Sequence, residues 1–269
     1  MAIPTTVIGA AGRMGRELVR YAVDCPDFEL AGAVEAPGHD LIGTDAGTVA
    51  GTAACGVFIT DDLKQALTKA EAVIAFADAD SAIEQARAAS EAGCAVVIGT
   101  TGLKETDKHA LESLAADGAR IVFAPNMSVG VNLLFHLCRK VAPALGPAYD
   151  IEVVEMHHNR KKDAPSGTAV RLGEILAEAS GVSYPEAVRH GREGMVGART
   201  DREIGMHAVR GGDVVGDHTV IFATEGERVE LTHKASSRQT FVKGAYRAVS
   251  FLAGAQPGLY DMQDVLGLS

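Results

Sequence analysis

The chain has 269 residues, of which 47% are hydrophobic and 22% charged, with a formal net charge of −10, and these values are typical of a globular protein with one large domain or two modest ones. The negative charge argues against general binding to nucleic acid or an anionic membrane, and no stretch approaches the ~18 uninterrupted apolar residues of a membrane span. Four scattered cysteines without zinc-ligand spacing, and the lack of a signal-peptide pattern, predict a cytoplasmic protein with no metal site.

Short apolar runs alternate with helical patterns through the first half of the chain. The expected strands cover residues 5–8, 28–34, 57–60, 72–76, 95–98 and 121–124. Helical patterns follow the first strand and cover residues 61–70, 81–92 and 106–116. Strands that alternate with helices of about ten residues predict an α/β fold with a Rossmann-type doubly wound parallel sheet.

The pattern changes after residue 125. A long apolar helix is expected over 129–144, a strand over 150–156 and an amphipathic helix over 166–179. Residues 204–210, 216–223 and 227–234 alternate and are separated by glycine-rich turns, which predicts a second α+β domain with a mainly antiparallel or mixed sheet. Between them, the glycine- and charge-rich residues 181–202 indicate a long loop.

A last helix is expected over residues 241–253, and we expect it to return to the first domain. The predicted organisation is therefore a dinucleotide-binding domain of residues 1–127 and 239–269, and a domain for substrate binding and oligomerisation of residues 128–238.

The first predicted strand ends in the glycine-rich sequence GAAGRMG at residues 9–15. Gly9, Gly12 and Gly15 at this spacing allow a tight turn, close approach of a pyrophosphate, and close packing of helix on strand. Such a turn also occurs in βα units that bind nothing. Here Glu35 stands 20 residues later at the end of the second strand, where an acid accepts hydrogen bonds from the adenosine ribose, and this favours a dinucleotide cofactor.

The residue after this acid is Ala36, whereas a 2′-phosphate requires a basic side chain. We therefore expect NADH to be used at least as well as NADPH, although Arg13 or a protonated His39 could tolerate the phosphate.

Two further loops follow predicted strands, at residues 99–102 and 124–128. Ligands of open α/β sheets bind at the carboxyl ends of the strands. Both loops are therefore candidates to hold the nicotinamide and its ribose, with ordinary connecting loops as the alternative.

The sequence HHNRKKDAPSGTA at residues 157–169 carries the most specific chemical signal. Its three cations would alone indicate a solvated face. Ser166, an N-cap candidate, is followed by Gly167 and Thr168, and a helix start beside cations makes a site for a small dianion. A histidine can act as a proton donor, because the pKa of an imidazole lies near neutral pH. His157 and His158 are expected to point to opposite sides of the strand.

These residues resemble the 4-hydroxy-tetrahydrodipicolinate reductase (dihydrodipicolinate reductase) family of the diaminopimelate route to lysine. The resemblance extends over residues 9–16, 99–102, 126–132, 155–169, 203–218 and 233–241, the last with its KASSR core. It implies reduction of 4-hydroxy-tetrahydrodipicolinate to tetrahydrodipicolinate by NADH and/or NADPH, with hydride transfer to C4 of the ring. It also implies a dianionic heterocyclic substrate and a homotetramer.

The resemblance further implies the roles of individual residues. His157 corresponds to the proton donor, and Lys161 to the lysine that assists it and binds substrate. His158, Gly167 and Thr168 match residues that hold the substrate carboxylates. The matched cofactor contacts are Gly9, Ala11, Gly12, Arg13, Met14, Gly15, Glu35, Gly99, Thr100, Thr101, Ala124, Pro125, Asn126 and Met127.

Two positions depart from the family pattern. Many members carry Arg at the position of Ala36, and some carry an aromatic residue at the position of Met127. The first departure bears on the choice between NADH and NADPH, and the second on how the nicotinamide packs.

Two rival functions remain open. One is another two-domain Rossmann oxidoreductase of a small dicarboxylate, and an acylating semialdehyde dehydrogenase of this kind requires a nucleophilic cysteine. Cys138 lies in an apolar helix, and the other three cysteines lie in the Rossmann half. The second rival is a non-enzymatic NAD sensor, which would not need the anion site beside His157.

Overall fold

The computed structural model describes residues 1–268 and divides the chain into two compact units. Unit 1 comprises Met1–Val129 and Gln239–Ser269, and unit 2 comprises Gly130–Arg238. The chain thus leaves unit 1, builds unit 2 and returns. The assignment of cofactor binding to the first unit and of substrate binding and oligomerisation to the second stays a prediction.

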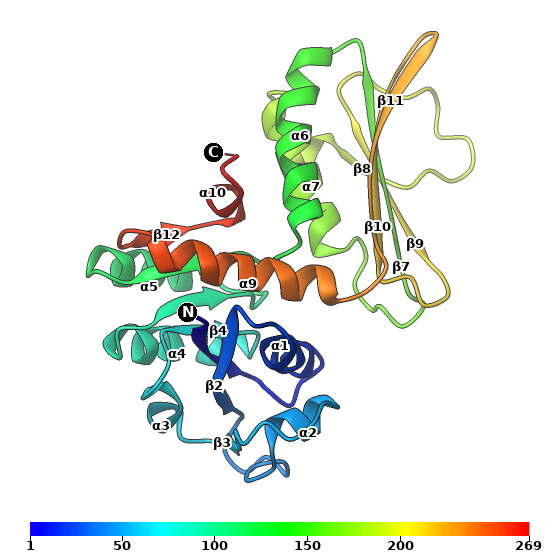
Figure 1. Cartoon of the computed structure of the whole chain (residues 1–269). Coiled ribbons are helices and arrows are strands. Elements are labelled where there is room, and N and C mark those ends of the chain that lie inside the picture. Colours follow the sequence, from blue (N-terminus) through cyan, green and yellow to red (C-terminus); the bar gives the residue numbers. More distant parts are fainter. Residues whose placement is uncertain (269) are drawn as a thin grey trace. The chain divides into compact units, whose positions relative to one another are not determined.

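Unit 1 contains a seven-stranded sheet in the order β12-β6-β5-β4-β1-β2-β3, and all its pairings are parallel. The strands are β1 (Ile3–Ile8), β2 (Phe28–Val34), β3 (Ile59–Thr60), β4 (Ala72–Ala75), β5 (Ala95–Ile98), β6 (Arg120–Phe123) and β12 (Gly258–Tyr260). The helices are α1 (Arg13–Asp24), α2 (Ala46–Ala50), α3 (Leu63–Leu67), α4 (Ala79–Glu91), α5 (Glu105–Ala116), α9 (Gln239–Gly254) and α10 (Met262–Leu266). The predicted doubly wound parallel sheet is confirmed (Figure 1).

Helices cover both faces of this sheet. Successive side chains of a strand point to opposite sides, so neighbouring residues pack in different clusters. Val7 and Ile74 pack in one cluster with α1 and α9, whereas the neighbouring Ile8 and Val73 pack in another with α4 and α5. This double burial explains why the central strands are continuous apolar runs rather than alternating ones.

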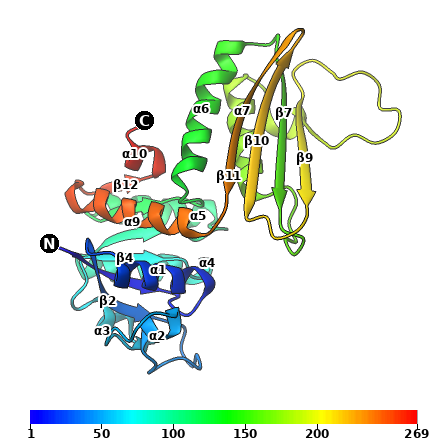
Figure 2. The ribbon, with the colours of Figure 1, turned by 45° about the vertical axis from the view of Figure 1, so that its right-hand side comes forward.

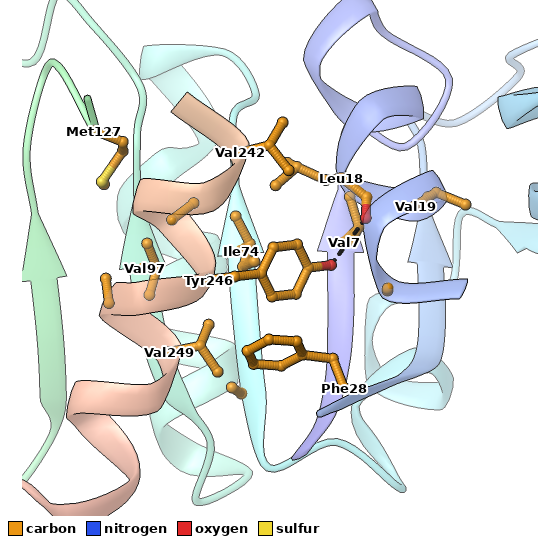
Figure 3. Close-up of a cluster of buried hydrophobic side chains, with 14 of the residues drawn as sticks. Val7, Leu18, Val19, Phe28, Ile74, Val97, Met127, Val242, Tyr246 and Val249 are labelled. Carbon is orange, nitrogen blue, oxygen red and sulfur yellow. Dashed lines mark hydrogen bonds between the residues drawn. The ribbon is translucent and has the colours of Figure 1, made fainter. Parts of the chain in front are cut away.

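Tyr246 of α9 is the largest of the buried side chains of unit 1, with 1% of its surface exposed. Its hydroxyl donates a hydrogen bond of 2.9 Å to the carbonyl of Leu18 in α1, and its ring lies 4.5 Å from that of Phe28 (Figure 3). A residue near the end of the chain thus completes a core that begins near its start.

Unit 2 is a mixed five-stranded sheet in the order β11-β10-β7-β9-β8 (Figure 2). The strands are β7 (Asp150–His157), β8 (Val188–His190), β9 (Ile204–Arg210), β10 (Gly216–Thr224) and β11 (Glu227–Ala235), and the helices are α6 (Val129–Leu145), α7 (Gly167–Ala179) and α8 (Tyr184–Ala187). Both long helices cover one face, where Phe135 of α6 and Leu172 of α7 pack with Val153 and Phe222 of the sheet.

Several short elements were not predicted. These are α2, α8, β8, β12 and α10. The expected loop of residues 181–202 contains α8 and β8, so only its second part is irregular. The strand at 204–210 pairs in parallel with β7, while the other two predicted strands pair antiparallel.

Among the described residues, 1–268, no helix is both long enough and apolar enough to cross a bilayer.

Candidate active site

The glycine turn after β1 is shaped by close backbone contacts. Gly9 adopts a φ of +76°, and its carbonyl accepts the N–H of Gly12 at 3.0 Å. A Cβ on Gly15 would lie 1.9 Å from the carbonyl oxygen of Gly9, so no side chain fits there. Gly12 is the N-cap of α1 and provides no side-chain cap, so the helix start fits the diphosphate of a dinucleotide.

Glu35 lies beside this turn. Its Oε2 accepts a hydrogen bond of 3.2 Å from the backbone N–H of Ala11. Arg13 and Ala36 are exposed, and Met14 packs partly against the core. The acid is thus positioned next to the helix start, as expected of a residue that binds the adenosine ribose.

The loops at Gly99 and Ala124 follow β5 and β6, so they share the carboxyl edge of the parallel sheet with Gly9 and Glu35. A Cβ on Gly99 would lie 2.3 Å from the Phe76 ring, and the hydroxyl of Thr100 donates to the carbonyl of Ala77 at 3.2 Å. Packing against residues 76–77 therefore explains a glycine at position 99 and a threonine at position 100 without a ligand. The exposed Thr101 is the more accessible position of this loop.

The loop after β6 mixes exposed and buried residues. Pro125 is exposed, whereas Ala124 and Met127 are buried, the latter with 1% exposed. The Asn126 side chain accepts the N–H of Ser128 at 2.9 Å. Because the Met127 side chain belongs to the core of unit 1, a cofactor contact at this position would involve its backbone.

A polar cluster occupies the end of the helix-covered face of unit 2. Strand pairing places Glu155 opposite His218 of β10, and His157 beside Arg210 of β9. Glu155 and His157 lie at even spacings from Val153 along β7, and His218 from Phe222 along β10, so these side chains and Arg210, the strand partner of His157, share the helix-covered face. Sequence reasoning gave a role only to His157, and missed Glu155, Arg210 and His218.

Hydrogen bonds connect the members of this cluster. The Nδ1 of His157 lies 2.6 Å from Oε2 of Glu155, a side chain with no exposed surface. Arg210 donates to both carboxylate oxygens, at 2.8 and 2.9 Å, and the backbone N–H of Ser166 donates to Oε1 at 3.0 Å. Nε2 of His218 lies 3.1 Å from the Ser166 hydroxyl.

The charges of the cluster follow from its burial and its partners. Burial alone raises the pKa of Glu155, but the hydrogen bonds from Arg210, His157 and Ser166 outweigh it and hold the pKa below its usual value. Burial lowers the pKa of His157 against the opposing effect of Glu155. Burial and the neighbouring His157 lower the pKa of His218 to about 3, so this ring is neutral at pH 7.

The start of α7 lies beside this cluster. Ser166 caps the helix as predicted, its hydroxyl accepting the N–H of Ala169 at 3.2 Å. Gly167 is exposed, and a Cβ there would meet no protein atom within 4 Å, while Thr168 is half-buried. Packing therefore does not require a glycine at this position. The open helix start, next to a histidine and cations, fits a carboxylate.

The loop between β7 and α7 carries the predicted cations. Nζ of Lys161 lies 2.8 Å from a carboxylate oxygen of Asp163, and its charge helps to lower the pKa of His157. Arg160 and Lys162 are exposed, in agreement with a solvated role. His158 is half-buried and its Nδ1 has no hydrogen-bond partner among the described residues.

The predicted catalytic and substrate residues are therefore gathered in unit 2, and the predicted cofactor residues in unit 1. A signal for the missed residues exists in the alternation of β7. Ile151 and Val153 point inward, so Glu155 and His157 continue the inward series. A carboxylate at an inward position requires a polar partner, and Arg210 is that partner.

Two of the cysteines are poor nucleophiles for an acylating dehydrogenase. All four are free thiols, and burial raises the pKa of Cys138 to about 12. Burial likewise raises the pKa of Cys94. Because the thiolate is the reactive form, both groups are inert at neutral pH.

Comparison with known families covers almost the whole chain. Residues 3–127 match the family model described as dihydrodipicolinate reductase, N-terminus, and residues 130–266 match that of the C-terminus. The chain belongs to the dihydrodipicolinate reductase family. It is 52% identical to the 4-hydroxy-tetrahydrodipicolinate reductase of Anaeromyxobacter dehalogenans over 97% of each chain, and 51% identical to that of Hahella chejuensis over 97% of this chain and 98% of the relative.

Solved structures support the same family. The dipicolinate-bound dihydrodipicolinate reductase of Paenisporosarcina sp. TG-14 superposes with a TM-score of 0.76 at 25% identity, covering 98% of this chain and 99% of that one. An amine dehydrogenase of Mycobacterium smegmatis shares the fold, with a TM-score of 0.60 at 13% identity over 95% of this chain and 94% of that one.

Proposed function

We propose that this chain reduces 4-hydroxy-tetrahydrodipicolinate to tetrahydrodipicolinate in diaminopimelate and lysine biosynthesis, with NADH or NADPH as reductant. The observation that carries the proposal is the match of both halves of the chain to one reductase family. The buried His157 beside an open helix start supports it, because this pairing suits a dicarboxylate that must receive a proton.

In the proposed reaction, the dihydronicotinamide supplies a hydride to C4 of the substrate ring. The 4-hydroxyl and one ring hydrogen leave as water, and the hydride at C4 and one proton on the ring complete the reduction. His157 holds that proton and donates it. Lys161 adds positive charge near the substrate, which favours binding of a dianion. The backbone at Gly167 and Thr168, with His158, would hold the carboxylates. The residues from Gly9 to Gly15, with Glu35, Gly99 to Thr101 and Ala124 to Met127, would hold the cofactor.

The experiment is a coupled assay in which a synthase makes the substrate from pyruvate and aspartate semialdehyde, and cofactor oxidation is followed by absorbance. Replacing His157 with Gln should lower kcat by ~10²-fold or more, because a general acid is lost. KM for NADH should stay almost unchanged.

A matched control is His109→Gln, since His109 is an exposed residue of α5 with a side chain 67% exposed. It should keep wild-type kinetics. Near-wild-type turnover of the His157 variant would remove His157 from the role of proton donor, whereas no turnover by the wild-type chain would refute the proposed function itself.

We also propose that the protein is a cytoplasmic homotetramer. The face of the unit 2 sheet opposite the helices has no covering element within unit 2, and it carries the exposed Val209, the strand partner of the outward-facing Met156. Free thiols suit a reducing compartment. Sedimentation should give about four times the 28.0 kDa chain mass, and a monomer at micromolar concentration would contradict the tetramer. Fractionation of source cells should recover the protein with cytoplasmic markers.

A further inference from the structure

We propose that Glu155, held by Arg210, is a positioning residue that fixes the ring of His157 so that Nε2 is the atom that donates the proton. The same carboxylate ties this imidazole to the helix start that would bind the substrate. The inference rests on the proposed role of His157 as proton donor, and it assigns a function to two residues outside that role.

The first argument is the tautomer of His157. An ionised carboxylate can only accept hydrogen bonds, so Nδ1 of His157, 2.6 Å from Oε2 of Glu155, must carry a hydrogen. The exchangeable proton of the imidazolium is then the one on Nε2. A Cβ on Gly216 would lie 3.0 Å from Nε2, so the glycine at this strand position leaves room beside the donating atom.

The second argument is that Arg210 keeps Glu155 ionised. Its guanidinium contacts both oxygens in a bidentate arrangement and comes from the end of β9, next to His157 in the sheet. A buried carboxylate without such a partner would take up a proton. Arg210 also donates to the carbonyl of Asp163 at 2.6 Å, so the same side chain fastens the loop that carries Lys161.

The third argument is the connection to α7. Oε2 of Glu155 accepts from His157, and Oε1 accepts the N–H of Ser166, the N-cap of the helix. A single rigid group thus determines both where the imidazole points and where the first turn of α7 begins. Geometry at this level controls rate, because a misplacement of about 1 Å can cost ~10²-fold in a catalysed step.

The charges around His157 make the carboxylate necessary. Lys161 on the following loop and Arg210 on β9 both disfavour the imidazolium, as does burial. His218 on β10 is neutral and meets the ring of His157 edge-on, with the ring centroids 5.2 Å apart. Asp163, in the loop after β7, is paired with Lys161. Glu155 is the group in direct contact that favours the protonated ring.

The test is Glu155→Gln in the full-length protein, which replaces the anion with a neutral group of the same shape. The nitrogen NMR shifts of His157, assigned by their absence in His157→Gln, report its tautomer and its pKa without any turnover. In the wild type the neutral ring should carry its hydrogen on Nδ1. In the variant the pKa of His157 should fall, and the amide should shift the neutral ring toward the Nε2–H form.

Kinetics provide the second readout. Glu155→Gln should lower kcat by about 10-fold or more; losing a residue that orients a metal-binding histidine costs about 10- to 100-fold, and losing the carboxylate of a catalytic triad about 10⁴-fold. Activity requires the protonated ring, so the fall in kcat at high pH should move to lower pH. In the His157→Gln background the same change should have no further effect, because Glu155 acts through that ring.

Glu152→Gln is the matched control, since Glu152 lies on β7 and is also paired with arginines, but points to the other face of the strand. It should leave the titration of His157 unchanged. Arg210→Lys keeps the charge without the bidentate contact and should give an intermediate shift, which preserves the test if Glu155→Gln does not fold. An unchanged tautomer and pKa of His157 would overturn the proposal, as would a further loss of kcat when Glu155→Gln is added to His157→Gln. Inactive wild-type protein would instead refute the proposed function.

Discussion

Glu35 accepts the N–H of Ala11 and therefore lies where the adenosine ribose is expected, while the next residue, Ala36, is exposed. The pair presents a carboxylate and no cation. A 2′-phosphate would meet repulsion from the acid and no compensating charge from this pair, so we expect NADH to be used at least as well as NADPH.

Ala36→Arg should raise kcat/KM for NADPH by about 10-fold, the value of one charge-assisted hydrogen bond to the phosphate, and should leave kcat/KM for NADH within a few-fold. The measurement is the ratio of kcat/KM for the two cofactors in wild type and variant. A strong NADPH preference in the wild-type chain would show that Arg13 or another cation already binds the phosphate.

Among single residues, the sequence predicted those site residues that lie close together along the chain. His157, Lys161 and the Ser166 cap stand close together in one motif. Arg210 and His218 come more than 50 residues after His157 and reach the site through the register of β9 and β10 with β7. That register depends on cross-strand packing, which no single stretch of sequence encodes.

Among the elements, α7 places its first residue, Gly167, where a side chain would meet no protein atom. Gly167→Ala should therefore leave the thermal midpoint equal or higher, because alanine loses less backbone freedom on folding. It should raise KM for the substrate by about 10-fold or more, since a methyl group would stand at the proposed carboxylate site, an effect of at least ~1.4 kcal/mol in binding.

Gly254→Ala is the control for this change. Gly254 ends α9, and a Cβ there also meets nothing within 4 Å. The control should keep KM unchanged. If Gly167→Ala also keeps the wild-type KM, the start of α7 does not hold the substrate.

The long elements of both units follow from periodicity, as in α4, α6 and α9, whose expected bounds lie within two residues of those observed. The short ones do not. The three residues of β12 carry no pattern of their own and become a strand because they pair with the edge of β6. Tertiary contact, rather than local preference, creates such elements.

For the whole molecule, the buried cluster predicts how stability depends on pH. Burial lowers the pKa of His218 to about 3 in the folded protein, against 6.5 for the exposed group. Below pH 6.5 the unfolded chain binds a proton at this histidine that the folded chain does not. With respect to His218, the folded state is therefore fully stable above pH 6.5 and loses stability as the pH falls toward 3.

As the pH falls from 6.5 to 5, His218 should therefore lower the free energy of unfolding with a slope that approaches about 1.4 kcal/mol per pH unit. Urea unfolding at several pH values measures the slope. His218→Gln, which can still bond to the Ser166 hydroxyl, should flatten it, whereas His109→Gln should not, because the hydrogen bond to Glu112 raises the pKa of His109. An equal slope in wild type and His218→Gln would show that the ring is not neutral when buried.

The chain order of the two units has a consequence for synthesis on the ribosome. Residues 130–238 emerge as one continuous block and contain every strand of the unit 2 sheet. The sheet of unit 1 is complete only after β12 at its edge has been synthesised, and its core is complete only after Tyr246 and the rest of α9. While more than one hundred later residues are translated, unit 1 therefore lacks α9, which packs on β4, β5 and β6, and only α1 is present on that face of the sheet.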